Sequence, residues 1–386
     1  MTGKKNISVF GATGSVGSST LSLVRAHPDK FAIQALTAHR NYQELATLAL
    51  EFRPACVVIS DEAFYTPLSD ALAGTDIDIL AGQSALEEVA GQKVDLLVAA
   101  IVGLAGLAAV WRAVEAGQTI ALANKETLVS AGHLMMPAAQ KSGAVLLPID
   151  SEHNAIFQCL RHENKDDIEK IILTASGGPF REMSVAEMEH VTLVQALQHP
   201  NWSMGPKVTI DSATMMNKGL ELIEAAWLFD EGTKKLDALI HPQSAIHGLV
   251  GFKDGSWLGQ LGIADMRVPI SYALGWPERL GWHSKPFDFS QAMQLDFAPV
   301  DSARFPCFKL AKSVLGRAPE LAIILNAANE VAVELFLGGK IRFNEIASQV
   351  EVALTAGDSG IKASSYDAVA ALDSEIRQRY LHPFSS

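Results

Sequence analysis

Short apolar runs and longer amphipathic stretches alternate through the first 150 residues. The apolar runs are NISVF, FAIQALTA, ACVVIS, DLLVAAIV, TIALAN and AVLLPID, and each has the length of one β-strand. Strands that alternate with helical stretches pair in parallel, because each crossover between parallel strands needs a helix-length connection. The pattern therefore predicts an α/β domain with a doubly wound, Rossmann-like parallel sheet and helices on both faces.

The longest uncharged run, from Leu96 to Trp111, is shorter than the roughly 20 apolar residues of a membrane-spanning helix. It is better explained as a buried strand, a turn at Gly103 and a helix packed on the sheet. The opening KKNISVF has too short an apolar stretch for a secretory signal peptide. We therefore expect no membrane partner.

Beyond residue 150 the alternation stops. The strand candidates KIILTA, ALIHP, AIHGLVGF and SWLGQLG lie among polar loops that contain glycine and proline, which predicts a second domain of mixed α/β type. Residues 281–302 show no sustained period and are expected to connect two domains. From residue 303 onward the pattern is helical and predicts a small bundle. The expected division is therefore 1–150, 151–280, a linker at 281–302, and 303–386.

Composition narrows the class of partner. A chain of 386 residues is long enough for two or three domains. Its net charge of −12 argues against a nucleic-acid partner, because phosphate backbones are bound by an excess of Lys and Arg. The cysteines Cys56, Cys159 and Cys307 are widely spaced and predict neither a disulfide framework nor a zinc site. A reducing cytoplasm suits this composition best.

A glycine-rich turn follows the first predicted strand. Gly11, Gly14 and Gly17 stand at G-x-x-G-x-x-G spacing in VFGATGSVGSST, directly before a predicted helix. Backbone N–H groups in such a turn can approach a pyrophosphate, and the helix N-terminus favours its negative charge. The alternative is a glycine turn that binds no ligand, but the strand–turn–helix context favours a dinucleotide.

The end of the second strand indicates which dinucleotide. NAD-binding proteins usually place an acidic residue there to hold the ribose 2′-hydroxyl. Here the strand ends LTAHRN and offers His39, Arg40 and Asn41 without an acid. Arg40 can pair with a 2′-phosphate, so NADP(H) is the preferred cofactor. Asn124 and Lys125 follow a later strand and are expected at the same ligand-binding edge.

Three titratable residues follow the last strand of the first domain. Asp150, Glu152 and His153 come directly after the apolar run in LLPIDSEHNAIF. If the chain is still extended there, the two carboxylates share one side and need a cation between them. An ordinary helix start explains the same residues, because Asp and Ser are good N-caps and Glu suits a first turn. The residues alone leave both interpretations open.

The second half supplies further polar clusters. Ser176 precedes a sharp glycine turn in LTASGGPF, which suits an oxyanion or a plain loop. If the chain is helical from residue 217 onward, Asn217, Lys218 and Glu221 share one face. The default interpretation of Lys218 and Glu221 is a surface ion pair. Together with Ser212, the three side chains also suit a bound phosphate and a metal. The segment HPNWSMGP, with Trp202, is either an aromatic lid or a loop anchored by a buried Trp.

Taken together, these motifs resemble the 1-deoxy-D-xylulose 5-phosphate reductoisomerases. The resemblance is carried, in this order, by ANKETL, DSEHNAIFQ, SGGPFR, HPNWSMG, DSATMMNKGLE, HPQSAIH, DMRVPI and LNAANE. It implies a homodimer with an NADPH-binding domain, a catalytic domain with a mobile flap at 199–206, and a C-terminal helical domain. It also implies NADPH- and metal-dependent rearrangement and reduction of 1-deoxy-D-xylulose 5-phosphate to 2-C-methyl-D-erythritol 4-phosphate.

The resemblance assigns roles by position. The implied metal ligands are Asp150, Glu152 and Glu221, whose carboxylates favour Mg²⁺, Mn²⁺ or Co²⁺; with Lys125 they form the implied catalytic set. The implied substrate-binding residues are Lys125, Ser151, Glu152, Ser176, His199, Trp202, Met204, Ser212, Asn217, Lys218 and Glu221. The implied cofactor-binding residues are Thr13, Gly14, Ser15, Val16, His39, Arg40, Asn41, Asn124, Glu126 and Gly205.

Two departures from the family pattern are mild. Ala12 stands where Ser is common, and His39 and Arg40 stand where Gly and Lys are frequent. His247 lies in a family motif without an assigned role. Two rival interpretations remain at this point: an NADP-dependent dehydrogenase of a phosphorylated sugar, which needs no carboxylate-only metal site, and a nucleotide-sensing protein, which leaves the polar helix face at 217–221 unexplained.

Overall fold

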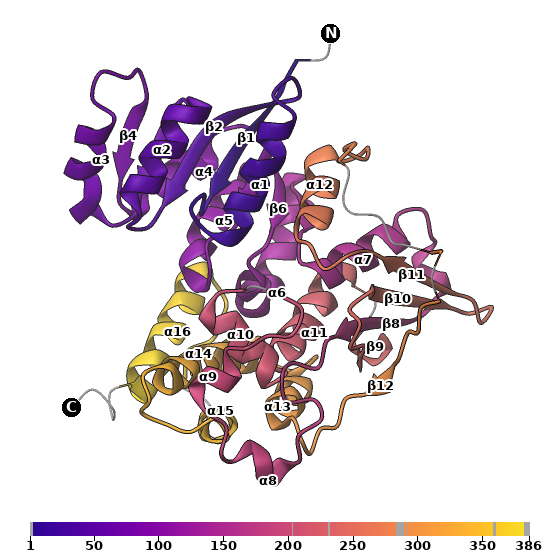
Figure 1. Ribbon diagram of the computed structural model, residues 1–386. Helices are drawn as coiled ribbons and strands as arrows, with labels where there is room; N and C mark the ends of the chain where they lie inside the picture. The colour runs from indigo at the N-terminus through magenta and orange to yellow at the C-terminus, as the bar shows by residue number, and fades with distance from the viewer. Residues whose placement is uncertain are drawn as a thin grey trace. The chain divides into compact units, whose positions relative to one another are not determined.

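The structure is a computed structural model of the chain, and it describes residues 3–202, 204–230, 232–282, 289–290, 292–357 and 360–381. The chain divides into two compact units, each assembled from segments that are distant in sequence (Figure 1). Unit 1 contains Met1–Thr127, Met135–Asn154 and Asp265–Ser284. Unit 2 contains Leu128–Leu134, Ala155–Ala264 and Lys285–Ser386.

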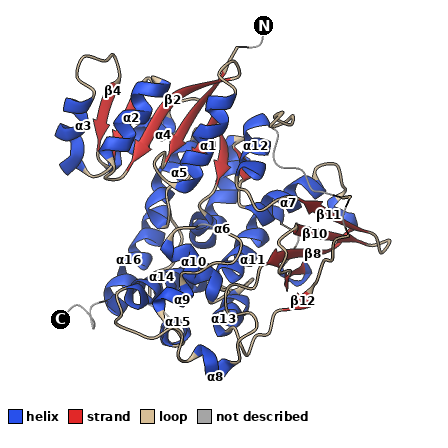
Figure 2. Cartoon of the chain, in the orientation of Figure 1, coloured by secondary structure: helices blue, strands red, loops and turns tan. Residues whose placement is uncertain are grey.

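Unit 1 is built on a parallel sheet. Among the described residues, seven strands follow one another in the order β4-β3-β2-β1-β5-β6-β7, and every neighbouring pair is parallel. Figure 2 draws the strands in red and labels β4 and β2 of this sheet. The strand order reverses between β1 and β5, which confirms the predicted doubly wound fold. The strands are β1 (Lys5–Phe10), β2 (Phe31–Ala38), β3 (Cys56–Ile59), β4 (Asp78–Ala81), β5 (Leu96–Ala99), β6 (Thr119–Leu122) and β7 (Val145–Pro148).

Helices connect these strands. Right-handed crossovers that leave β1 and β5 in opposite directions place helices on both faces of the sheet, where α1 packs on α12 and α4 packs on α5. The predicted strand, turn and helix around Gly103 are confirmed, with Gly103 at φ +71°. The helices are α1 (Ser15–Ala26), α2 (Tyr42–Phe52), α3 (Tyr65–Ala71), α4 (Gln83–Gly91), α5 (Leu107–Glu115) and α12 (Arg267–Gly275), with 3₁₀ turns at Glu62–Phe64 and Leu104–Gly106.

Strand β4 is not among the strands that the sequence pattern predicts. Its four residues, DILA, are all exposed or half-buried at the outer edge of the sheet. An edge strand of this kind needs no continuous apolar run, so it leaves little hydrophobic signal in the sequence.

Two long helices contribute to both units. Helix α6 (Lys125–Ser142) supplies residues 128–134 to unit 2, and α7 (Ser151–Leu160) passes from unit 1 to unit 2 after Asn154. Helix α12 lies in the range predicted for the second domain, yet it belongs to unit 1 and contacts β6 and β7. The three-domain division stays a prediction, and its linker includes residues 283–288 and 291, which lie outside the described part of the chain.

Unit 2 contains a mixed sheet, as predicted for this part of the chain. The described strands follow the order β11-β10-β8-β9-β12. Strand β8 pairs in parallel with β9, whereas β10 is antiparallel to both β8 and β11. The strands are β8 (Ile168–Ala175), β9 (Leu236–Ile240), β10 (Ile246–Phe252), β11 (Trp257–Leu261) and β12 (Ala298–Pro299).

The helical bundle predicted after residue 303 is also present in unit 2. Helix α14 is its centre, because it packs on both α15 and α16 and most of its side chains are buried. The helices of this unit are α8 (Val185–Met188), α9 (Leu193–Ala196), α10 (Pro206–Ala213), α11 (Met216–Phe229), α13 (Pro306–Val314), α14 (Pro319–Leu337), α15 (Glu345–Ala356) and α16 (Tyr366–Leu381), with 3₁₀ turns at Lys165–Asp167 and Thr233–Lys235. No helix among the described residues has the length and apolar character that crossing a bilayer requires.

Candidate active site

The glycine turn after β1 has no space for side chains at two of its positions. Gly11 has φ +85°, and a Cβ there would lie 2.6 Å from the carbonyl oxygen of Ala100. A Cβ on Gly17 would lie 2.3 Å from the carbonyl oxygen of Gly11. The turn therefore folds tightly against the start of α1. Its outer part, residues 13–16, is exposed or half-buried and presents backbone groups at the helix N-terminus, as a bound pyrophosphate requires.

Arg40 lies after β2 and is held by a residue that follows β3. Its Nε lies 2.7 Å from the carboxylate of Asp61, although the Arg40 side chain is 67% exposed. His39 makes a similar contact through Nδ1, 2.9 Å from the hydroxyl of Ser60. The Arg40 guanidinium lowers the pKa of Asp61. This ion pair fixes the direction of the Arg40 side chain. The terminal nitrogens of Arg40 belong to a largely exposed side chain, and this arrangement suits a 2′-phosphate.

Two other predicted cofactor residues are used in helix capping. The side chain of Asn41 accepts a hydrogen bond from the backbone N–H of Glu44 at the start of α2. Asn124 accepts one from Thr127 at the start of α6, and its amide group donates to two carbonyl oxygens of the loop after β5, at 2.6 Å each. Asn124 and Glu126 are both buried. The structure thus gives Asn124 a definite role in shaping the ligand edge of the sheet.

The carboxylates after β7 lie at a helix start. Strand β7 ends at Pro148 and α7 begins at Ser151, so of the two local structures that the sequence left open the chain adopts the helix start. Asp150 precedes the helix and Glu152 lies in its first turn. The partial positive charge of a helix N-terminus stabilises carboxylates in this position.

A cation lies against one of these carboxylates. The Lys125 ammonium is 2.6 Å from Asp150 Oδ2, and both side chains are largely buried. The hydroxyl of Ser151 donates to Glu152 at 2.5 Å. A carboxylate oxygen of Asp150 lies within 4.8 Å of one of Glu152, and carboxylate oxygens are the donors that a hard divalent ion prefers. The local chemistry therefore fits the metal that the sequence implies.

In unit 2, His199 joins two serines that are distant in sequence. Its Nε2 lies 3.1 Å from the hydroxyl oxygens of both Ser176 and Ser212. Its Nδ1 accepts hydrogen bonds from the backbone N–H groups of Asn201 and Trp202, so the neutral ring carries its proton on Nε2. Burial lowers the pKa of His199 to about 4. The cluster presents neutral O–H and N–H donors, which suit a phosphate group.

The segment after His199 is fastened at its tip. The amide of Asn201 donates to the carbonyl oxygen of Pro242 and to the hydroxyl of Ser244, at 2.9 Å each. The ring of Trp202 lies 6.2 Å from that of His247, and Trp202 is half-buried. The sequence did not single out Asn201; a polar residue between the predicted ligand His199 and the aromatic Trp202 was the signal available.

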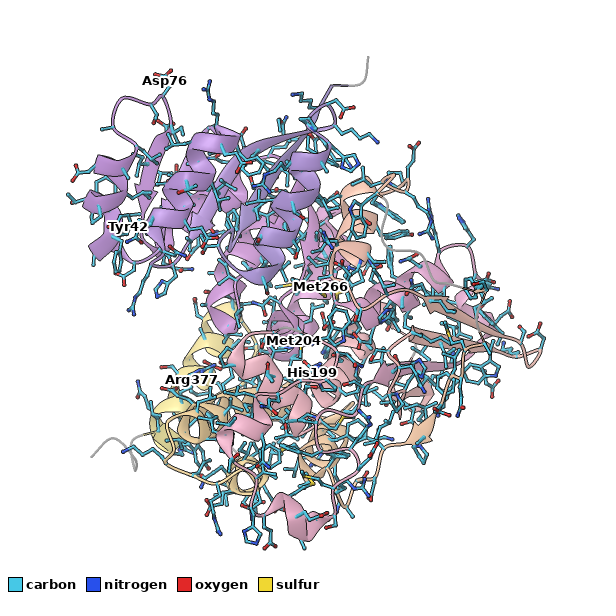
Figure 3. The ribbon with its side chains drawn as sticks, in the orientation of Figure 1. Tyr42, Asp76, His199, Met204, Met266 and Arg377 are labelled. Atoms are coloured by element: carbon cyan, nitrogen blue, oxygen red, sulfur yellow. The ribbon has the colours of Figure 1, made fainter. Side chains whose placement is uncertain are left out.

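The same segment leads directly into helix α10. It can be followed in Figure 3, where His199 and Met204 are labelled. Gly205 is the N-cap of α10, and Pro206 occupies its first turn, as is favourable for a helix start. Residue 203 of the predicted flap lies outside the described residues.

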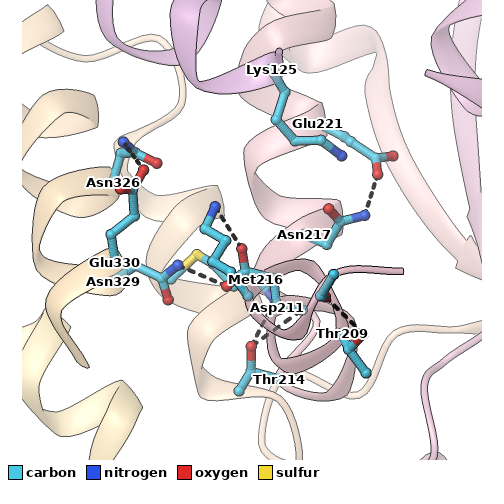
Figure 4. Close-up of polar contacts among 12 residues, drawn as sticks. Lys125, Thr209, Asp211, Thr214, Met216, Asn217, Glu221, Asn326, Asn329 and Glu330 are labelled. Carbon is cyan, nitrogen blue, oxygen red and sulfur yellow. Dashed lines mark hydrogen bonds and ion pairs between the residues drawn. The ribbon is translucent and has the colours of Figure 1, made fainter. Parts of the chain in front are cut away.

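Helix α11 carries the third polar cluster. Asn217 donates to the carboxylate of Glu221 (Figure 4), and Lys218 donates to the other oxygen of the same carboxylate. Lys218 is 3% and Glu221 0% exposed, so the default expectation of a surface ion pair was wrong. The helix also buries Leu222, Ala225 and Phe229 in the core of unit 2. A carboxylate at this depth needs a cation, and Lys218 provides one.

The comparisons with known proteins agree across the chain. Three family models match: 1-deoxy-D-xylulose 5-phosphate reductoisomerase over residues 7–132, its C-terminal domain over 146–229, and the DXP reductoisomerase C-terminal domain over 261–379. A curated 1-deoxy-D-xylulose 5-phosphate reductoisomerase of Rhodopseudomonas palustris (strain BisB18) is 49% identical over 372 residues, covering 95% of this chain and 91% of the relative. That of Zymomonas mobilis is 48% identical over 377 residues, covering 98% and 97%.

Solved structures show the same similarity. The Zymomonas mobilis reductoisomerase in complex with NADPH matches with a TM-score of 0.92 and 46% identity, covering 99% of this chain and all of that one. A DOX-P reductoisomerase in complex with NADPH, fosmidomycin and magnesium matches with a TM-score of 0.93 and 43% identity, covering 98% of each chain.

Proposed function

The chain belongs to the 1-deoxy-D-xylulose 5-phosphate reductoisomerase family, and we infer from this membership which of its residues serve the family's reaction. It is an NADPH- and divalent-metal-dependent oxidoreductase that converts 1-deoxy-D-xylulose 5-phosphate into 2-C-methyl-D-erythritol 4-phosphate. The single observation that carries the residue assignment is the close approach of the carboxylates of Asp150 and Glu152 at the start of α7, whose oxygens lie within 4.8 Å of one another. A simple dehydrogenase has no need of such a carboxylate set.

We assign the metal ligands to Asp150 and Glu152 of unit 1 and to Glu221 of unit 2. The first two are supported by the close approach of their carboxylate oxygens. Glu221 is supported by the family motif DSATMMNKGLE and by its burial with a cationic partner. When bound, the divalent ion supplies a Lewis acid for the ketone and hydroxyl oxygens of the substrate, and NADPH supplies the hydride.

The phosphate of the substrate is assigned to the cluster of Ser176, His199 and Ser212. The three side chains converge on one another, and each offers a hydrogen-bond donor to a phosphate oxygen. Asn217 and Lys218 extend this site along α11. Because the pKa of His199 is about 4, the ring binds as a neutral donor at neutral pH.

The remaining substrate contacts are assigned on the family motifs. Lys125 and Ser151 are placed near the reacting carbons, where the Lys125 ammonium also orients Asp150. Trp202 and Met204 are assigned to a flap that excludes water from the reaction. The bond between Asn201 and the segment at 242–244 supports this, because it fastens the flap over its own unit.

The cofactor is assigned to the glycine turn and to the residues after β2. Thr13, Gly14, Ser15 and Val16 receive the pyrophosphate, and Arg40, held by Asp61, receives the 2′-phosphate. His39 and Asn41 flank it. The family motifs alone assign three more residues to the cofactor: Asn124, Glu126 and Gly205.

A homodimer is part of the proposal. Strand β11 ends the order of described strands in its sheet, and its side chains Trp257, Leu258 and Leu261 are 51%, 42% and 40% exposed. An apolar edge strand left in solvent promotes association, and a second copy of the chain provides the matching edge. We place the enzyme in the cytoplasm, as its composition suggests.

One assay tests the function. Protein, NADPH, Mn²⁺ and 1-deoxy-D-xylulose 5-phosphate are mixed, the absorbance of reduced cofactor is followed, and the product is examined by carbon NMR. Rearrangement creates a quaternary carbon that bears the methyl group, whereas direct reduction of the ketone leaves only a secondary alcohol. Consumption of NADPH without the quaternary carbon would support the simple dehydrogenase, and no consumption would support a sensor.

A further inference from the structure

Helix α10 is tied to the C-terminal bundle by a buried carboxylate. Asp211 is 1% exposed and Asn329, on α14, is fully buried. The amide of Asn329 donates to Asp211 Oδ1 at 2.8 Å, and Lys207 lies 2.9 Å from the other carboxylate oxygen. Figure 4 shows the side chain of Asn329 directed at Asp211.

This arrangement is poorly explained by stability alone. Burying a charged carboxylate costs free energy that its partners often fail to offset, and apolar side chains of similar volume stabilise a core as well or better. The carbonyl oxygen of Asn329 is buried without a hydrogen-bond partner in the described part of the chain, which adds to the cost. In some proteins a buried polar pair of this kind specifies one geometry.

The contact between Asp211 and Asn329 constrains the position of the residue that follows Asp211. Ser212 follows Asp211 directly, and its hydroxyl lies 3.1 Å from His199 Nε2. The backbone around Ser212 is also closely packed, because a Cβ on Gly178 would lie 2.7 Å from the Ser212 carbonyl oxygen. A small shift of α10 along or about its axis would therefore move Ser212 out of its cluster.

We propose that Asp211 and Asn329 are positioning residues for the phosphate site: they fix α10 on the C-terminal bundle and so hold Ser212 against His199. The bundle thereby takes part in substrate binding although none of its described residues belongs to the assigned phosphate cluster. The inference rests on the proposed role of Ser212 in phosphate binding.

The test exchanges the two side chains. Asn329→Asp places two carboxylates in contact, so we expect the dissociation constant of fosmidomycin, used as a phosphonate probe with NADPH and Mg²⁺, and the KM for the sugar phosphate to rise about tenfold. The kcat should change less than about twofold, because the reacting groups are untouched. In Asp211→Asn/Asn329→Asp an amide again faces a carboxylate, and both constants should return to within about threefold of the wild type.

A matched control uses the next residue of the same helix. Glu330→Gln breaks the 2.6 Å ion pair that joins α14 to Arg377 of α16, so it loosens the bundle without touching α10. It should lower the melting temperature and leave the KM unchanged. An equal rise of KM in this control would overturn the proposal, since it would show a general effect of bundle stability. If Asn329→Asp fails to fold, Asn329→Leu, of similar volume, is measured instead with the same expected rise.

Two further outcomes separate the inference from its premise. A rise of the fosmidomycin dissociation constant in Ser212→Ala, without one in the Asn329 variants, would leave the phosphate site in place and sink the positioning role. No rise in Ser212→Ala would overturn the phosphate site and the inference together. NADPH affinity, which depends mainly on the glycine turn of unit 1, should change less than the fosmidomycin dissociation constant in the Asn329 variants, where any change reflects Gly205 at the start of α10.

Discussion

The ammonium group of Lys218 lies against the carboxylate of Glu221 one turn further along α11, and neither side chain is more than 3% exposed. An i, i+3 pair of this kind is usually a solvated feature of a helix surface. Here the pair is buried partly because α13 packs closely on α11. Gly219 permits this close approach, since a Cβ on it would lie 2.4 Å from Ala311 Cβ. A buried ion pair contributes little to stability, so its retention is better explained by the reaction.

We expect Glu221→Gln to retain its fold and lose most of its turnover, with kcat lower by about a hundredfold. A neutral amide is a weaker ligand than a carboxylate, and the substitution also leaves Lys218 without its charge partner, which costs about 3 kcal/mol of stability. Activity is titrated with Mn²⁺, and unfolding is followed in urea. Near-normal activity at low Mn²⁺ would remove Glu221 from the ligand set.

Arg40→Ala should weaken NADPH binding much more than NADH binding. A charge-assisted contact with the 2′-phosphate contributes roughly 1.5–3 kcal/mol, which corresponds to at least a tenfold loss of NADPH affinity. Both affinities are measured by calorimetry. Arg25→Ala is the matched control, because Arg25 is also an exposed arginine of unit 1 that pairs with an acid, Glu51. If the ratio of NADPH affinity to NADH affinity is the same in Arg40→Ala as in the wild type, Arg40 is merely solvated.

His199 predicts a dependence of stability on pH. Its folded pKa of about 4 lies below its ordinary value of 6.5, so the unfolded chain binds a proton first as the pH falls. The contribution to stability is therefore complete above pH 6.5 and is lost as the pH falls towards 4. After allowance for solvent screening of the partly exposed ring, the loss is about 1 kcal/mol.

The measurement compares urea unfolding of the wild type and His199→Gln at pH 7 and pH 5. Glutamine keeps hydrogen-bonding capacity and does not titrate, so the wild type should lose more of its free energy of unfolding between the two pH values. Identical losses would show that the folded ring titrates as it does in the unfolded chain.

A short phosphonate that carries a hydroxamate should compete with the sugar phosphate and should bind only with the metal. Its hydroxamate oxygens chelate the ion, and its phosphonate takes the place of the substrate phosphate beside Ser176 and Ser212. Because both groups are on one molecule, each raises the effective concentration of the other. Calorimetry with Mn²⁺, and again after a chelator has removed it, measures the difference. Equal affinity in both titrations would rule out this binding mode.

Most of the architecture of unit 1 could be predicted because it is written in local patterns. Buried parallel strands leave continuous apolar runs, and the residues of β1 and β2 match the predicted runs almost residue for residue. The half-exposed edge strand β4 was missed because it carries no such run. At Asp150 the sequence was compatible with two local structures, and the start of α7 decided between them.

The sequence by itself determined the kinds of chemistry available: a glycine turn for a pyrophosphate, a cation after β2, and carboxylates without Cys or His. Only the tertiary structure decided how these groups are used, because burial and partners come from segments far away in the chain. Ser176, His199 and Ser212 converge through the packing of three separate segments. Asp211 gains its partner from Asn329, 118 residues further on. No local pattern encodes such a distance, since each side chain responds only to what the folded chain places beside it.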